Sequence, residues 1–160
     1  MAATSVARVS TATMAADRVF IDTNVLVAAS VEAHPSHAVA TAFLERLARD
    51  GANACISSQV CREFLAVLTR GPVEGRTFGV EEALAALDAW TSACELLDDG
   101  DPVLPELLDL IRRFAVRGKQ VHDANIVATM RAHGVTILAT LNGSDFRRFD
   151  ELISLAPLVS

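Results

Sequence analysis

The part of the chain best suited to chemistry begins at Asp22. This acid directly follows the apolar run Val19–Ile21, which predicts a short strand buried on both faces of a parallel sheet. Ligand sites in such sheets lie beyond the carboxyl ends of the strands, where Asp22 would emerge. An ionised carboxylate in apolar surroundings is unfavourable unless it is paired, hydrogen-bonded or bound to a metal ion. The alternative is that Asp22 caps the following helical turn, assisted by Thr23 and Asn24.

Two further acids stand in line with the apolar faces of predicted helices. Glu63 shares a helix face with Val60 and Phe64, and Asp123 precedes the apolar stripe 126–130 of a later helix. Acids are depleted from such positions, although each of these also lies near a helix start, where the dipole favours negative charge. A helix-start carboxylate that reaches water is therefore the alternative for each acid.

A fourth acid, Asp145, lies in the loop after a second apolar run, 135–139. If the four acids converge, either their pKa values rise or divalent cations neutralise them. Oxygen ligands without a His or Cys companion favour Mg²⁺ or Mn²⁺ over zinc. The buried placement of the acids favours such a metal-binding carboxylate cluster.

Positioning these acids requires a sheet covered by helices. Short apolar runs alternate with helical stripes, which predicts an α/β fold with a largely parallel sheet. A short turn should follow the first strand. Strands are expected at 19–21, 54–56, 96–97, 135–139 and 152–155. Helices are expected from Ser36 to Gly51, from Ser57 or Ser58 past Leu68, over 80–93, from between Pro102 and Glu106 to Gly118, and over 121–133.

The composition indicates one well-packed domain, which we expect to span residues 18–160. Of the 160 residues, 51% are hydrophobic and 21% are charged, so the chain can bury a substantial core. Residues 1–17 are rich in Ala, Thr and Ser but lack the hydrophobic centre of a signal peptide, so we expect a disordered extension. Met14 is an alternative start.

The net charge of −6 and the lack of a polybasic block argue against binding nucleic acid through bulk electrostatics. They leave room for an enzyme that meets nucleic acid through metal ions and one local basic patch. Single cysteines at 55, 61 and 94 lack the spacing of a zinc or redox pair, so we expect buried reduced thiols in a cytoplasmic protein. No apolar run is long enough for a membrane helix.

Taken in order, the same residues resemble a known family. The motifs are Val19-Phe20-Ile21-Asp22-Thr23-Asn24-Val25, then Glu63 early in a helix, then His122-Asp123-Ala124, then Thr140-x-Asn142-x-x-Asp145-Phe146. This ordered set is similar to the PIN-domain ribonucleases, and in particular to the VapC-type toxins of bacterial toxin–antitoxin pairs. The resemblance extends over residues 18–159, and its specificity comes from the order rather than from any one piece.

The resemblance implies a PIN-like α/β/α sandwich and Mg²⁺-dependent endonucleolytic cleavage of RNA, with Mn²⁺ able to substitute. It also implies a homodimer and inhibition by a small cognate antitoxin protein. Asp22, Glu63 and Asp123 match the principal catalytic and metal-binding acids, and one or two metal ions held there would activate a water. Asp145 is our candidate for the fourth acid, because Asn142 stands where some members have an acid.

Other polar residues are expected to support this site. Thr23 or Asn24, together with Thr140, would orient the acids through hydrogen bonds, and Asn142 adjoins the fourth acid. His122 is expected to be structural, since the family's mechanism needs no histidine base. The densest basic group could contact RNA phosphates, although a solvated helix face is the more usual meaning of such a group. It consists of Arg112, Arg113, Arg117 and Lys119.

Two other functions fit parts of the pattern. Haloacid-dehalogenase-like phosphatases also carry an aspartate after the first strand, but they need a second aspartate where this chain has Asn24. A catalytically inactive PIN-like module that binds RNA or protein is the second alternative. Such degenerate forms should lack some of the acids, whereas Asp22, Glu63 and Asp123 are all present, which favours catalysis.

Overall fold

A computed structural model describes residues 17–159 of the chain. The extension that we expected to be disordered lies outside the described residues as far as residue 16, and so does Met14. Within the described part, five parallel strands form one sheet in the order β3-β2-β1-β4-β5. The strands are β1 (Arg18–Ile21), β2 (Asn53–Ser57), β3 (Glu95–Leu97), β4 (Ile137–Ala139) and β5 (Ser154–Leu155).

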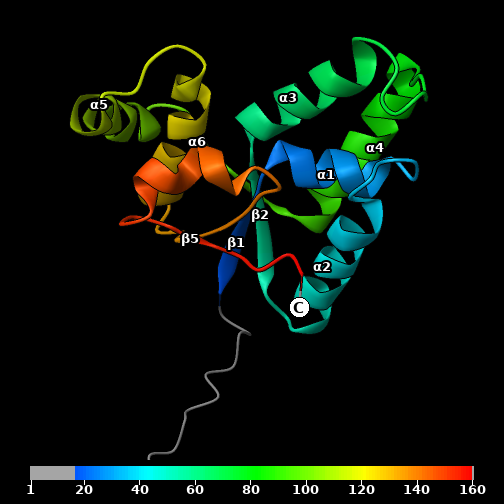
Figure 1. The fold of residues 1–160 in the computed structure, drawn as a ribbon, viewed down its shortest axis with the longest axis horizontal. Helices are drawn as coiled ribbons and strands as arrows, with labels where there is room; N and C mark the ends of the chain where they lie inside the picture. Colours follow the sequence, from blue (N-terminus) through cyan, green and yellow to red (C-terminus); the bar gives the residue numbers. More distant parts are fainter. Residues whose placement is uncertain (1–16, 160) are drawn as a thin grey trace, which may run out of the picture.

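Helices cover this sheet on both sides, which confirms the predicted PIN-like α/β/α sandwich (Figure 1). Helices α1 to α4 lie to the right of the sheet in this view, and α5 and α6 lie to its left. The helices are α1 (Thr23–Ser30), α2 (His37–Arg49), α3 (Ser58–Thr69), α4 (Val80–Ala93), α5 (Val103–Phe114), α6 (Gln120–Ala132) and a 3-10 helix, η2 (Gly143–Phe149). Among residues 17–159, no helix is both long and apolar enough to cross a membrane.

The central strand β1 explains where the chain places its first acid. Val19, Phe20 and Ile21 are at most 1% exposed, because β2 and β4 flank them and helices cover both faces. Ile21 pairs with Ala139 of β4, so the residues that follow the two strands, Asp22 and Thr140, emerge side by side. The strand register therefore brings together polar groups that are far apart in the sequence.

Two helices differ from the prediction, one near the start of the described residues and one in the second half of the chain. The first strand leads into the eight-residue helix α1 rather than a short turn. Val25, Leu26 and Ala28 are fully buried, so this helix lacks the alternation of apolar and polar faces that would reveal it. Helix α5 ends at Phe114 and not at Gly118, because Ala115 adopts a left-handed conformation with φ of 50°.

The predicted strand 135–139 is also shorter than expected. Helix α6 ends in a Schellman motif, in which Val135 N–H donates to the Met130 carbonyl at 2.8 Å and Gly134 has φ of 67°. Val135 therefore completes the end of the helix, and β4 begins only at Ile137.

Candidate active site

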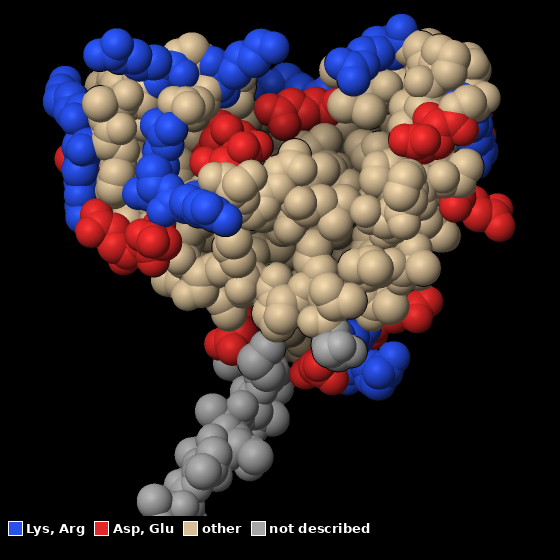
Figure 2. All heavy atoms as spheres, in the orientation of Figure 1, with Lys and Arg blue, Asp and Glu red and all other residues tan. Residues whose placement is uncertain are grey.

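One cavity of about 490 Å³ opens at the carboxyl ends of the strands. All four acids predicted from the sequence line it, so the structure brings them to one place. The predicted residues in its lining are Asp22, Thr23, Asn24, Glu63, Asp123, Asn142 and Asp145. Thr140 is not part of this lining and is buried, with its hydroxyl on Asp22. In Figure 2, acidic side chains lie in a notch between two lobes, which correspond to α3–α4 and α5–α6 in Figure 1.

Asp22 is the most buried of the four acids, with 7% of its surface exposed. Its Oδ2 accepts hydrogen bonds from the Thr140 hydroxyl at 2.7 Å and from Asn24 Nδ2 at 2.9 Å. Burial raises the pKa of Asp22 to about 6, against the lowering effect of the Thr140 hydrogen bond. Asp22 does occupy the N-cap position of α1, but its side chain makes no capping hydrogen bond. Capping alone therefore does not explain this carboxylate.

Asn24 and Thr140 form a network that holds Asp22 from one side. Asn24 Nδ2 also donates to Thr140 Oγ1 at 3.1 Å, and Asn24 Oδ1 accepts from Leu141 N–H at 2.9 Å. Thr140 Oγ1 accepts a further bond from Asn142 N–H at 3.1 Å. The Thr140 hydroxyl thus uses its one proton on the carboxylate and its lone pairs on two nitrogen donors.

Glu63 lies half-buried on α3 and faces the cavity. Its Oε2 accepts from the Thr23 hydroxyl at 3.0 Å, and its Oε1 accepts from Gln59 Nε2 at 2.8 Å. Both carboxylate oxygens are therefore fixed by neutral donors, which leave lone pairs free toward the cavity.

Asp123 and Asp145 complete the acidic wall. Asp123 is half-buried in the first turn of α6, and Asp145 is exposed in η2. Burial raises the pKa of Asp123, and the nearby carboxylates of Asp145 and Glu63 raise it further. The like-charged neighbours favour a bound cation over a set of isolated helix-start carboxylates.

The sequence reasoning missed two residues that line the cavity. His34 lies in the lining, and so does Arg70 after α3. Arg70 is seven residues beyond Glu63, so the helical repeat places both on one face, and this signal was available in the sequence. For His34 the sequence carries no such signal, because it lies between α1 and α2 and only tertiary packing brings it to the site.

The predicted RNA-contacting group is exposed but does not line the cavity. Its member Arg113 pairs with Glu151 at 2.6 Å and lies over the Phe114 ring. In Figure 2, Lys and Arg side chains gather on the left lobe and on the upper edge of the right lobe, around the acids. Positively charged side chains therefore form a rim around the negatively charged floor of the notch.

The side chains in the cavity fit Mg²⁺ or Mn²⁺ in their chemistry. Apart from His34, they offer carboxylate oxygens and no cysteine, and oxygen ligands suit these hard cations. Within the described residues, no group of three or more His, Cys, Asp or Glu side chains already stands close enough to share one ion. The side chains therefore match such a cation in the type of their donor atoms and in charge. Binding of the ion would draw the acids closer together.

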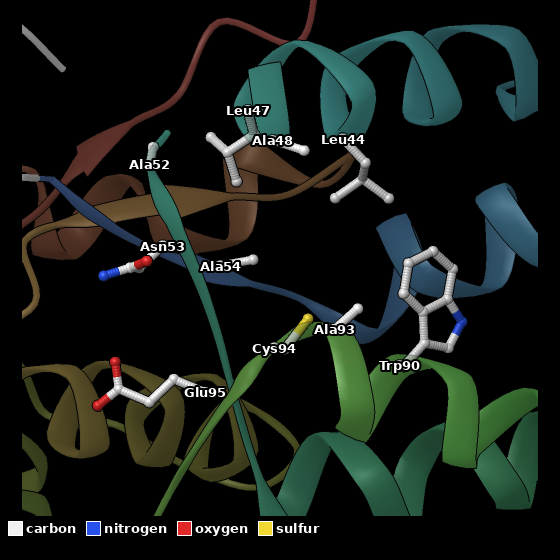
Figure 3. Close-up of a pocket in the computed structure, with 10 residues that line it drawn as sticks. All are labelled: Leu44, Leu47, Ala48, Ala52, Asn53, Ala54, Trp90, Ala93, Cys94 and Glu95. Carbon is white, nitrogen blue, oxygen red and sulfur yellow. The ribbon is translucent and has the colours of Figure 1, made fainter. Parts of the chain in front are cut away.

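A second cavity, of about 310 Å³, lies between α2 and α4 at the amino ends of β2 and β3. Figure 3 shows Leu44 and Leu47 reaching into it from α2, opposite Cys94 and Trp90. Its one carboxylate, Glu95, pairs with Arg18 at 3.1 Å. This cavity offers no converging acids and is not a candidate for the chemistry.

The cysteines contribute nothing to the acidic cavity. All three are free thiols, of which Cys55 is buried while Cys61 and Cys94 are half-buried, so the expectation of buried thiols holds fully only for Cys55. Burial raises the pKa of Cys55 to about 12 and that of Cys94 to about 11, which keeps these thiols protonated at neutral pH.

Comparisons with known proteins show which proteins this chain is similar to. Ribonuclease VapC48 of Mycobacterium tuberculosis is similar over 134 residues at 29% identity, which covers 81% of this chain and 90% of that protein. Among solved structures, VapBC2 from Rickettsia felis, bound to a promoter DNA fragment, has a TM-score of 0.64 at 21% identity and covers 87% of this chain and 97% of that one.

The structure of Mycobacterium tuberculosis VapC20, a toxin that cleaves the sarcin–ricin loop, has a TM-score of 0.64 at 19% identity. It covers 87% of this chain and 99% of that one, and at such identity the likeness establishes the fold. The model of the PIN domain family matches residues 19–152, which is most of the chain and includes every acid of the cavity. This chain is therefore a member of the PIN domain family.

Proposed function

We propose that this protein is a metal-dependent endoribonuclease and the toxin of a toxin–antitoxin pair. The observation that carries the proposal is the single cavity in which Asp22, Glu63, Asp123 and Asp145 converge at the carboxyl ends of the strands. The similar proteins are named as ribonucleases or belong to VapBC complexes, which supports an RNA substrate and a protein antitoxin as partners. A homodimer is part of the same proposal.

Asp22, Glu63 and Asp123 would hold Mg²⁺, or Mn²⁺ in its place, with Asp145 as the fourth acid. The chemistry that such an ion would supply is a nucleophilic water at neutral pH and neutralisation of charge on the phosphate and the leaving oxygen. The chain itself orients this carboxylate, since Thr140 and Asn24 donate hydrogen bonds to Oδ2 of Asp22. The 7% exposure of Asp22 keeps bulk water from competing at this carboxylate.

Cleavage of total and structured RNAs by the purified, antitoxin-free protein tests the proposal. We expect discrete fragments with Mg²⁺ or Mn²⁺, and no fragments with EDTA or with the variant Asp22→Asn. Asp22→Asn keeps the shape and an oxygen acceptor for Thr140, so it removes charge with little change in packing. Cleavage that survives in this variant would show a contaminating nuclease or refute the role of Asp22.

The alternative is a PIN-like module that binds RNA or protein without catalysis. The pKa of Asp22, which is raised to about 6, argues against this alternative. A buried acid with acidic neighbours destabilises the fold, and a module that only binds would gain nothing from retaining it. RNA binding that is unaffected by EDTA, with no cleavage and no calorimetric binding of Mn²⁺, would favour the alternative.

A further inference from the structure

The side chain of Gln59 connects the two helices that carry two of the acids. Gln59 is in the first turn of α3, one turn before Glu63, and only 5% of its surface is exposed. A buried primary amide must find partners for two donors and one acceptor. Its partners determine what the residue can do at this site.

All the hydrogen-bonding groups of this amide are used, and they reach both helices. Nε2 donates to Glu63 Oε1 at 2.8 Å and to the His122 carbonyl of α6 at 3.0 Å. Oε1 accepts from Asn125 Nδ2 of α6 at 2.7 Å. His122 and Asn125 lie on either side of Asp123 within two residues of it, so this one side chain ties Glu63 to the backbone around Asp123.

The network also fixes which way the amide points. The His122 carbonyl can only accept, so it requires Nε2 of Gln59 on its side, where Glu63 Oε1 also accepts, and this leaves the amide oxygen for Asn125 Nδ2. A glutamate at this position could not donate to either group. The arrangement therefore depends on an amide. An apolar residue of equal size would fill the space without forming these hydrogen bonds.

The location of the amide makes this connection important for the site. Helices α3 and α6 belong to the two lobes that flank the acidic notch, and they make few other close contacts with each other (Figure 1). Glu63 and Asp123 both line the acidic cavity, and their like charges repel each other when both are ionised. A neutral link between the lobes opposes this separation.

We propose that Gln59 is a positioning residue, which sets the spacing of Glu63 and Asp123 for cation binding through its hydrogen bonds to Glu63, His122 and Asn125. This inference rests on the proposed function, in which the two acids hold a metal ion. Gln59 itself contacts neither ion nor RNA. It belongs to the outer shell of hydrogen bonds that orients metal ligands.

The test is the affinity of the full chain for Mn²⁺, measured by isothermal titration calorimetry without RNA. Gln59→Met keeps the volume and removes all three hydrogen bonds, and we expect Mn²⁺ to bind about ten- to hundredfold more weakly. The matched control is Thr129→Val on α6, which removes a fully buried hydroxyl that donates to the Asn125 carbonyl at 2.9 Å. This control should leave the affinity unchanged.

Two further variants make the result decisive. In a Glu63→Gln background, Gln59→Met should weaken binding by a much smaller factor, because one of the two ligands that it positions is already lost. If Gln59→Met fails to fold by circular dichroism, Asn125→Ala removes only the hydrogen bond to Gln59 Oε1 and should still weaken binding by several fold.

The outcomes separate this inference from the proposed function. Wild-type affinity in Gln59→Met, an equal loss in Thr129→Val, or the same factor in both Glu63 backgrounds would overturn the role of Gln59 alone. Failure of the wild-type chain to bind Mn²⁺ would overturn the metal-dependent function, and the inference with it.

Discussion

Asp22 is the residue at which the stability of the fold and the proposed function conflict. It is 7% exposed and its pKa is raised to about 6, mainly by burial. Because the ordinary value is 3.8, the folded state binds the proton more tightly than the unfolded state does. Ionisation of Asp22 therefore destabilises the metal-free fold, and this cost grows as the pH rises from 3.8 to about 6.

We predict that Asp22→Asn stabilises the metal-free protein at pH 7.5. The shift from 3.8 to about 6 corresponds to about 3 kcal/mol of unfolding free energy, which the neutral amide would recover. The gain should be full above pH 6 and vanish below pH 4, where Asp22 is protonated in both states. Urea unfolding in EDTA at pH 7.5 and at pH 3.5 measures it, and an equal effect at both pH values would contradict the stated cause.

A second prediction concerns the hydroxyl that holds Asp22. Thr140→Val removes the 2.7 Å hydrogen bond to Oδ2 and also leaves Asn24 Nδ2 without one acceptor. We expect RNA cleavage at saturating Mn²⁺ to slow by about ten- to hundredfold, as for other groups that orient metal ligands. Thr140→Ser retains the hydroxyl and should retain most of the rate. Equal initial rates for the Ser and Val variants would refute this role of the hydroxyl.

At the scale of elements, the sequence predicts those helices and strands that local sequence patterns determine. The apolar run before Asp22 predicted β1, and the helix predicted over 80–93 matches α4 (Val80–Ala93) because its apolar period is a local signal. Helix α1 was missed because it is buried on several sides, and the end of α5 because an alanine occupies a position typical of glycine.

The candidate site was predictable to a similar extent. The four acids were identified from their positions at strand ends and on apolar helix faces, and the structure places all of them in one cavity, while their roles stay predictions. Gln59 and His34 were not identified. Gln59 reads as an ordinary helix residue, and its partners Asn125 and His122 are more than 60 residues away, so only the tertiary fold reveals the link.

Helix α5 leads to a prediction about stability. Ala115 occupies the left-handed position of a Schellman motif, in which Val116 N–H donates to the Ile111 carbonyl at 3.2 Å. Ala115→Gly should raise the free energy of unfolding by roughly 0.5–1 kcal/mol, since a left-handed conformation is costly only for residues with a Cβ. Gly134→Ala, at the same position of α6, should lower it by about 1 kcal/mol. Urea unfolding of both variants checks the pair, and a loss of stability in Ala115→Gly would contradict the argument.

At the scale of the whole molecule, the net charge of −6 opposes the binding of RNA. The acids in the notch add local repulsion, so under the proposed function the affinity for RNA would come from cations in the cavity and from the basic rim seen in Figure 2. Among the basic side chains, Arg70 lines the acidic cavity and makes no ion pair with any described residue. Arg113, by contrast, is already paired with Glu151.

Arg70 should therefore contribute more to RNA binding than any member of the basic group around α5. We predict that Arg70→Gln raises the Kd for RNA several fold and lowers the salt dependence of binding by about one phosphate contact. Arg49→Gln is the matched control, because Arg49 is equally exposed but ends α2 near the opposite end of the sheet. Filter binding of RNA to the Asp22→Asn background at several salt concentrations measures both quantities without cleavage. If Arg112→Gln or Arg117→Gln reduces the salt dependence while Arg70→Gln does not, RNA approaches along the α5 lobe, and the cavity-lining arginine serves only to balance the charge of the acids.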